Sequence, residues 1–292
     1  MKIKFEEVVQ EITELTGMSE EYVKDMVWEE ALDRGSVVSK EAKKWFVHPH
    51  IYDENMEKFY VESDAFIFEL MVESCREGKQ IVVERIKERI ENYIKMKCSE
   101  KINILLFGDG VGSDTISLYQ TFQDKAEIFY YDIPGSKTYE FAVKRFKKRD
   151  MKINFLTDYY NIHNKFFDVV ICLEVLEHLP DPLALIKKFN EVLKDGGICL
   201  ITESFEAVLP EFPTHLKKNL KYAYQTPFLF LKNNLYLTYY PRSFPYKRPM
   251  EFKKIKNISI KERLRLYTNS ELIIPLIRNY LKLIFKKALG KI

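Results

Sequence analysis

The feature that most constrains the fold is a stretch near the middle of the chain, residues 102–114, which reads INILLFGDGVGSD. A short apolar run, too short for a helix, leads into three glycines at alternate positions, and Ser113 and Asp114 are suited to begin a helix. The pattern predicts a strand, a tight loop and a helix. Glycine leaves the backbone open to a ligand, and a helix N-terminus adds partial positive charge. We therefore expect a nucleotide-like cofactor at Gly108, Gly110 and Gly112.

Alternating strand and helix patterns follow this stretch and predict an α/β fold, with a parallel sheet covered on both faces. Beyond Pro210 the alternation fades, and two further apolar runs predict an antiparallel closing hairpin. The expected strands are 102–107, 126–131, 152–156, 167–173, 198–202, 235–240 and 250–254, and the expected helices within this region are 113–122, 136–148 and 182–193. We thus expect a cofactor-binding domain over residues 99–257.

The flanking segments have a different character. Residues 1–98 predict a helical arm, with helices at 7–15, 19–32, 54–75 and 79–97. The third of these helices is more aromatic than a solvent-facing helix needs, so it either packs in the core or forms a lid or wall over the substrate pocket. Residues 258–292 predict a basic helical extension, amphipathic over 271–289.

Composition limits the setting in which the chain works. No window of its 292 residues approaches the roughly 18–20 apolar residues of a membrane span, and the charged first residues lack the apolar segment of a signal peptide. The four cysteines lack metal-ligand spacing, so we expect reduced thiols and a cytoplasmic protein.

The charge is polarised along the chain. Residues 1–100 carry 15 Lys and Arg against 23 Asp and Glu, a balance of −8, whereas residues 241–292 carry 14 against 3, a balance of +11. The basic C-terminal helix is compatible with peripheral membrane contact, with docking on its own domain, or with a homodimer.

The glycine spacing separates two classes of cofactor. A dinucleotide fingerprint requires G-x-G-x-x-G, but here the spacing is G-x-G-x-G and Ser113 occupies the final position. Asp132 follows the second strand, where a carboxylate accepts hydrogen bonds from ribose hydroxyls. This acidic residue fits both nicotinamide dinucleotides and S-adenosylmethionine.

The fourth predicted strand and the residues after it decide between them. The segment FDVVICLEVLEHLPDP over 167–182, followed by LKDGG over 193–197, resembles the class I S-adenosylmethionine-dependent methyltransferases, closest to the branch of ubiquinone-biosynthesis O-methyltransferases and small-molecule and glycan methyltransferases. The resemblance covers residues 101–203. It implies a Rossmann-like sheet of seven strands, the last antiparallel, with S-adenosylmethionine across the carboxyl ends of the strands.

The same resemblance implies a set of cofactor-binding residues. The three glycines would hold the methionine part, Asp132 the ribose and Ile133 the adenine; Asp158, followed by Tyr159, would meet the adenine amino group, and Leu173 and Glu174 would line the sulfonium side. One departure is Leu106, which stands where the family usually has an acidic residue that holds the methionine amino group. Asp109, a backbone carbonyl or an arm side chain would then substitute, or cofactor binding is weakened.

Methyl transfer to a hydroxyl needs a base, and two histidines are candidates. His215 follows the fifth strand, where Glu203 at the strand tip is placed to orient it, and His178 is nearest in sequence to the cofactor site. The alternative for His178 is a structural role in its loop. Some relatives are thought to hold a divalent cation through a set matched by Glu174, Glu177 and His178, but we expect no metal here.

The leading prediction is thus a methyltransferase that acts on a hydroxyl of a small molecule or saccharide. A nucleic-acid methyltransferase would use the basic C-terminus, but the acidic arm and the absence of a base-flipping motif after the fourth strand argue against a nucleic-acid partner. A non-catalytic binding module is a third reading, made conceivable by Leu106.

Overall fold

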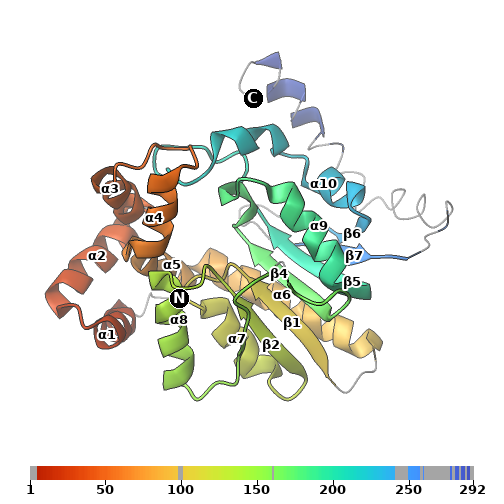
Figure 1. The fold of residues 1–292 in the computed structure, drawn as a ribbon, viewed down its shortest axis with the longest axis horizontal. Helices are drawn as coiled ribbons and strands as arrows, with labels where there is room; N and C mark the ends of the chain where they lie inside the picture. The colour runs from red at the N-terminus through yellow and green to blue at the C-terminus, as the bar shows by residue number, and fades with distance from the viewer. Residues whose placement is uncertain are drawn as a thin grey trace.

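The computed structural model describes residues 5–97, 101–159, 161–240, 249–256, 259 and nine positions between 277 and 289. In these residues, a single mixed sheet carries the cofactor-binding domain (Figure 1). Its strand order is β3-β2-β1-β4-β5-β7-β6. The strands are β1 (Ile102–Phe107), β2 (Ala126–Tyr131), β3 (Asn154–Phe155), β4 (Phe167–Leu173), β5 (Leu193–Thr202), β6 (Leu235–Tyr239) and β7 (Met250–Lys254).

The sheet confirms the predicted fold class. The first five strands pair in parallel, and β7 runs antiparallel to both of its neighbours, β5 and β6. The central strands are buried on both faces, which explains their continuous apolar runs. Strand β3 is shorter than predicted, and β5 begins earlier, because Leu193 already pairs with Phe167 across an irregularity in the register.

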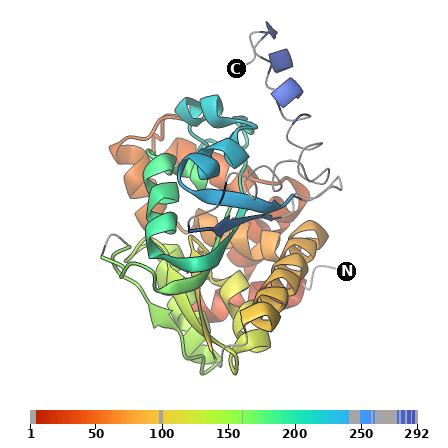
Figure 2. The ribbon, with the colours of Figure 1, turned by 90° about the vertical axis from the view of Figure 1, so that its right-hand side faces the viewer.

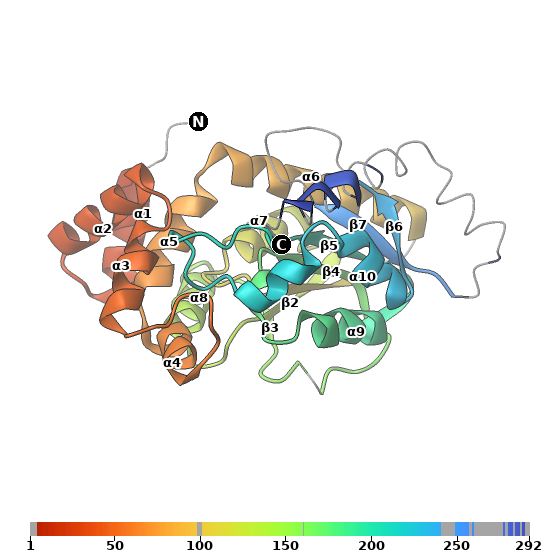
Figure 3. The same cartoon turned by 90° about the horizontal axis from the view of Figure 1, so that it is seen from above.

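Two layers of helices cover the sheet, as Figure 3 shows from above. On one face, α6 (Glu77–Lys97) and α7 (Ser113–Phe122) enclose Ile104, Leu106 and Ile128, and α8 (Lys137–Lys148) packs on Tyr130. The opposite face is covered by α9 (Pro182–Val192) and α10 (Thr226–Lys232). Figure 2 shows α6 running along one side of the sheet. Helix α10 and the 3₁₀ helices Leu176–His178 and Lys217–Tyr222 are additions that the sequence patterns did not predict.

The arm stands at one end of the sheet in Figure 1. It consists of α1 (Phe5–Thr16), α2 (Glu20–Leu32), α3 (Ser36–Lys44), α4 (Glu54–Glu62) and α5 (Ala65–Ser74). The single helix predicted over 54–75 is wrong, because Ser63 adopts an extended conformation and its hydroxyl accepts a hydrogen bond from Ala65 N–H at 3.2 Å, which starts a new helix. The predicted break at Glu77 and Gly78 is also displaced: α6 begins at Glu77 and runs through the glycine.

The C-terminal helix predicted over 271–289 falls partly outside the described residues. Its described positions from Ile277 to Ala288 are helical, and the ammonium groups of Lys282 and Lys286 lie 5.9 and 4.9 Å from the centre of the Tyr224 ring. This contact docks the cationic side of the helix on its own domain. The helix exposes apolar side chains at Ile277, Tyr280, Leu281, Ile284, Phe285 and Leu289.

In the part of the chain that the structure describes, no helix combines the length and the apolar character that crossing a bilayer requires.

Candidate cofactor and acceptor site

One cavity joins the glycine loop to the helical arm. Its volume is about 1010 Å³, at the upper end of the roughly 300–1,000 Å³ of ligand pockets. Of the predicted cofactor residues, those that line it are Gly108, Gly110, Asp132, Ile133, Tyr159, Leu173 and Glu174. Both predicted histidines, His178 and His215, line the same cavity. The structure therefore brings the predicted cofactor seat and the predicted base candidates into one space.

The glycine loop has the backbone conformation that only glycine adopts without strain. Gly108, Gly110 and Gly112 have φ values of +74°, +49° and +74°. A Cβ on Gly108 would lie 2.6 Å from a Val175 methyl carbon. Gly112 does not line the cavity and instead serves packing, because a Cβ there would lie 2.4 Å from the Phe146 ring of α8.

Asp132 holds the loop from the end of β2. One carboxylate oxygen accepts a hydrogen bond from Gly110 N–H at 2.6 Å and the other from Ile133 N–H at 2.7 Å. Burial raises the pKa of Asp132, opposed by these two hydrogen bonds. Each carboxylate oxygen retains acceptor capacity, so the geometry is compatible with a vicinal diol of ribose.

The residues around Leu106 show which charged groups lie near the position where the family usually has an acidic residue. Leu106 is buried on the α6 face of the sheet and borders a small chamber of about 60 Å³ with Lys79, Asp109 and Asp114. The Asp109 carboxylate accepts hydrogen bonds from Thr115 N–H and Oγ1–H at 2.7 and 2.6 Å, so it caps α7. Burial and the Asp114 charge raise the pKa of Asp109 to about 7.

Lys79 brings a cation from α6 to this chamber. Its ammonium lies 2.6 Å from an Asp114 carboxylate oxygen, and the side chain also lines the large cavity. The charges beside the glycine loop therefore come from α6 and α7 rather than from β1.

Glu174 shows backbone strain at the edge of the cavity. Its φ is +53°, uncommon for a residue with a side chain, and its carboxylate accepts a hydrogen bond from the Ser204 hydroxyl. Such strain is concentrated at binding sites, which agrees with the predicted position on the sulfonium side.

The predicted adenine residues lie at different depths. Tyr159 lines the cavity and meets Phe107 and Tyr131 edge-on at 5.4 Å each, whereas Ile133 is 39% exposed at the rim. Asp158 is exposed and accepts a hydrogen bond from the Asn161 amide at 2.7 Å; it is not among the residues that line the cavity. Its contact with the adenine stays a prediction.

His178 makes two polar contacts through Nδ1. This atom lies 3.2 Å from the Thr214 carbonyl oxygen and 3.0 Å from the Tyr60 hydroxyl. Because a carbonyl only accepts, the Thr214 contact favours the tautomer with the proton on Nδ1 and the lone pair on Nε2. Burial lowers the pKa of His178 to about 4, so the ring is neutral at pH 7.

His215 lies beside His178. The two imidazole centres are 4.7 Å apart with the rings nearly perpendicular, and His215 stacks on Phe212 at 5.1 Å. The Glu203 carboxylate accepts hydrogen bonds from Phe205 N–H at 3.0 Å and the Thr226 hydroxyl at 2.7 Å, and it is not among the residues that line the cavity. These contacts give Glu203 a role in holding the chain after β5, and its orientation of His215 stays a prediction.

The two histidines form a cluster with Glu177. Glu177, His178 and His215 each offer a ligand atom, and these atoms lie within 4.8 Å of one another. The neutral ring of His178 with its lone pair on Nε2 is the form that binds a metal. The donor set thus fits a divalent cation, although it differs from the Glu174, Glu177 and His178 set that the resemblance implied.

The arm contributes polar residues to the cavity that the sequence patterns did not indicate. Arg34, Glu69, Glu73 and Tyr60 line the cavity from α2–α5 and their connections, and Arg76 and Lys79 line it where α6 begins. The aromatic richness of residues 54–75 left core packing and a pocket wall open. Phe59 and Phe68 lie in the core, whereas Tyr60 and Phe66 line the cavity, and a role over the substrate stays a prediction.

Comparisons with known proteins agree with this geometry. A family model described as a methyltransferase domain matches residues 79–260, more than half of the chain. The chain belongs to this methyltransferase domain family. The resemblance found in the sequence is thus confirmed, and with it S-adenosylmethionine as the cofactor of the fold.

Several curated relatives match the chain over short stretches, so the chain spans less than a fifth of their length in these matches. They include ubiquinone biosynthesis O-methyltransferases of Psychrobacter cryohalolentis, 45% identical over 14% of this chain and 16% of the relative, and of Idiomarina loihiensis, 61% identical over 11% and 13%. Among solved structures, a CurJ carbon methyltransferase aligns with a TM-score of 0.50 and 13% identity, covering 65% of this chain and 58% of the other. This last similarity supports the fold alone.

Proposed function

We propose that the protein is an S-adenosylmethionine-dependent methyltransferase that methylates a hydroxyl group of a small molecule or saccharide. The observation that carries the proposal is the shared cavity, in which the glycine loop and Asp132 face the imidazole pair His178 and His215. The ubiquinone biosynthesis O-methyltransferases that match in part support transfer to oxygen.

The charge of the cavity wall argues for an acceptor without negative charge. The lining has seven carboxylic acids, of which Glu69 carries its proton at pH 7, against three basic side chains: Glu69, Glu73, Glu77, Asp132, Glu174, Glu206 and Glu211 against Arg34, Arg76 and Lys79. A phosphate-rich acceptor would be repelled. Carboxylates beside aromatic rings such as Tyr60 and Phe212 suit a hydroxylated molecule, which supports a saccharide or phenol and argues against nucleic acid.

The chemistry asks three things of the chain. S-adenosylmethionine supplies an activated methyl group on a cationic sulfur. The chain holds the acceptor oxygen in line with that methyl group, excludes water by means of the arm, and accepts the hydroxyl proton as the oxygen–carbon bond forms and the carbon–sulfur bond breaks. His215 is placed to accept the proton, and His178 fixes its position through the edge-on contact.

Two measurements test the proposal in sequence. Calorimetry with S-adenosylhomocysteine should show saturable binding by the wild type. Asp132→Ala should lower the affinity for S-adenosylhomocysteine about tenfold or more, because a charge-assisted hydrogen bond contributes about 1.5–3 kcal/mol. Absence of binding by the wild type would leave only the non-catalytic binding module. Retention of DNA or RNA that weakens with salt would favour the nucleic-acid alternative.

The base assignment has its own test. With labelled S-adenosylmethionine and a panel of phenols and sugars, we expect His215→Ala to lower turnover about 10²–10⁴-fold while its affinity for S-adenosylhomocysteine stays within twofold. His163→Ala, an exposed loop histidine, is the control and should match the wild type. An unchanged turnover number for His215→Ala would remove this residue from the mechanism.

A second role for the same cluster is favoured by its geometry. Glu177, His178 and His215 would hold a divalent cation, which would polarise the acceptor hydroxyl. Chelator treatment separates the two roles: activity retained in EDTA supports the base, whereas activity lost in EDTA and restored by Mg²⁺ or Zn²⁺ assigns the cluster to metal binding. A cytoplasmic location, a homodimer and membrane contact by the C-terminal helix stay predictions.

A further inference from the structure

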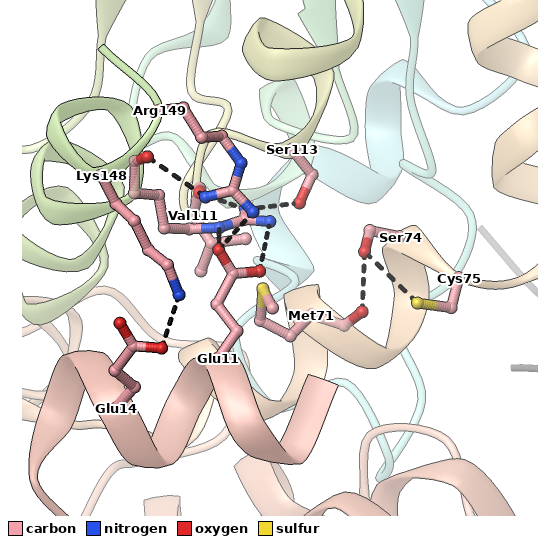
Figure 4. Close-up of polar contacts among 10 residues, drawn as sticks. Glu11, Glu14, Met71, Ser74, Cys75, Val111, Ser113, Lys148 and Arg149 are labelled. Atoms are coloured by element: carbon pink, nitrogen blue, oxygen red, sulfur yellow. Dashed lines mark hydrogen bonds and ion pairs between the residues drawn. The ribbon is translucent and has the colours of Figure 1, made fainter. Parts of the chain in front are cut away.

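A buried arginine connects the helical arm to the glycine loop. Arg145 lies in α8 and is 6% exposed. Its Nη1 donates hydrogen bonds to the Val111 carbonyl at 2.7 Å and to the Ser113 hydroxyl at 2.8 Å, and its Nε and Nη2 donate to the two carboxylate oxygens of Glu11 at 3.2 Å each. Figure 4 shows this network between α1, α8 and the loop. The Arg145 guanidinium therefore binds the helical arm and the glycine loop at the same time.

The Glu11 carboxylate is held by two arginine side chains. Its side chain is 13% exposed, and a second guanidinium, that of Arg149, lies 2.6 Å from one of its oxygens. Burial alone would raise the pKa of Glu11, but Arg145 and Arg149 outweigh that effect and hold the pKa below its usual value. The carboxylate is thus charged, and losing it would leave Arg145 without its partner in the arm.

Two further contacts seat the same loop on the arm. The Val111 side chain is 1% exposed and belongs to the apolar cluster formed by α1–α5, with Phe141 of α8. Gly110 faces Leu70 of α5 so closely that a Cβ would lie 2.3 Å from a Leu70 methyl carbon. Three neighbouring loop positions, 110, 111 and 113, therefore depend on where the arm lies.

We propose that Glu11 and Arg145 are positioning residues that couple docking of the arm to binding of the cofactor at the glycine loop. Neither side chain lines the cavity, so the effect is transmitted through the Val111 carbonyl and the Ser113 hydroxyl. The inference rests on the proposed cofactor site. Coupling between two equilibria is reciprocal. If the docked arm tightens cofactor binding by a given factor, the cofactor should favour the docked arm by the same factor.

The chain offers a matched control on the same pair of helices. Glu14 of α1 and Lys148 of α8 form an ion pair of 2.5 Å, with side chains 50% and 41% exposed. It joins the same two helices at the protein surface (Figure 4). An exposed pair contributes little to stability.

The test compares Glu11→Gln with Glu14→Gln by calorimetry with S-adenosylhomocysteine. We expect Glu11→Gln to raise the dissociation constant about five- to tenfold, within the usual range of coupling between sites, and Glu14→Gln to change it less than twofold. Arg145→Lys, which keeps the charge but loses the forked geometry, should behave like Glu11→Gln. Equal affinities for Glu11→Gln, Glu14→Gln and wild type would overturn the coupling.

Hydrogen exchange supplies a readout that a merely structural role would not move. S-adenosylhomocysteine should slow amide exchange in α1 of the wild type and of Glu14→Gln, and this protection should be weaker in Glu11→Gln. Protection of equal size in all three proteins would contradict the proposal even if affinity fell. Absence of any binding by the wild type would instead reject the proposed function itself.

Discussion

Glu69 differs from the other acids of the cavity wall in its protonation. Burial, together with the negative charges of Glu30 and Glu73 and against the charge of Arg34, raises the pKa of Glu69 to about 8. At pH 7 the carboxyl therefore carries its proton, and it offers a hydrogen-bond donor to the acceptor. Burial also raises the pKa of Glu73, one turn further along α5, but Arg34 and Arg76, which lie 3.0 and 3.2 Å from its oxygens, oppose that effect.

This contrast predicts a pH-dependent effect on stability. The folded state binds the Glu69 proton more tightly than the unfolded chain does, so the stabilisation is complete below about pH 4.5 and is lost as the pH rises through about 8. Glu69→Gln mimics the protonated form. We expect its melting temperature to match that of the wild type at pH 4, below both pKa values, to exceed it at pH 6, and to exceed it further at pH 9.

Glu73→Gln provides the comparison in the same thermal scans. It should lower the melting temperature at pH 6 and at pH 9, because it leaves the partly buried guanidinium of Arg76 and the exposed one of Arg34 without their common carboxylate. If Glu69→Gln and Glu73→Gln followed the same pH profile, the protonated state of Glu69 would be wrong.

The glycine loop shows how a whole element can depend on one missing side chain. Gly112 and Gly135 both have positive φ, +74° and +80°, but only Gly112 faces a neighbour, the Phe146 ring of α8. Alanine at either position incurs about 1–2 kcal/mol for the left-handed backbone. At Gly112, overpacking against α8 adds roughly 1–3 kcal/mol.

We therefore expect Gly112→Ala to lower the free energy of unfolding by about 1–3 kcal/mol more than Gly135→Ala does. Urea titration followed by circular dichroism measures both values. Equal decreases in the free energy of unfolding of the two variants would show that the loop can move away from α8 without destabilising the protein. Because Gly112 does not line the cavity, a change in cofactor affinity caused by Gly112→Ala would be transmitted from the contact with α8 through the loop.

The sheet and the cofactor half of the site were predictable from the sequence because their signals are local. A buried parallel strand is a continuous apolar run, and its loop residues follow immediately, so Gly108 and Asp132 could be placed beside the cavity from their positions after strands, whereas Glu174 came from the family resemblance. Element boundaries were less predictable. The break at Ser63 depends on one serine hydroxyl that accepts from a backbone N–H, a choice that helical periodicity does not record.

The acceptor half was not predictable for a different reason. Tyr60 reaches His178 across 118 positions of sequence, and Arg145 reaches Glu11 across 134. Such pairs are chosen by packing of the arm against the sheet, which no short window of sequence encodes. His215 was found because it follows β5, whereas its neighbour Phe212 and the acids on α5 required the three-dimensional arrangement.

At the scale of the whole molecule, the arm and the cofactor-binding domain share apolar clusters in addition to the ion pairs between α1 and α8. Val111 and Phe141 from the cofactor-binding domain lie in the cluster of α1–α5, and α6, expected within the arm, packs on β1 through Ile86 and Ile90. Separate unfolding of the arm would expose these side chains to water.

We therefore expect one cooperative unfolding transition. Differential scanning calorimetry should give a calorimetric enthalpy equal to the van't Hoff enthalpy. S-adenosylhomocysteine at 100 times its dissociation constant should stabilise the whole transition by about 2.7 kcal/mol. Two transitions, of which only the second responded to the ligand, would show that the arm melts independently.

The close approach of Gly110 to Leu70 has a consequence for how proteins of this kind are recombined. An arm taken from another methyltransferase brings its own side chains to the loop, and a bulkier residue at the Leu70 position would press directly on backbone. An arm without an acid at the Glu11 position would leave Arg145 half satisfied. Chimeras designed to alter acceptor preference should therefore keep Glu11 and Leu70 together with the glycine loop of the same protein.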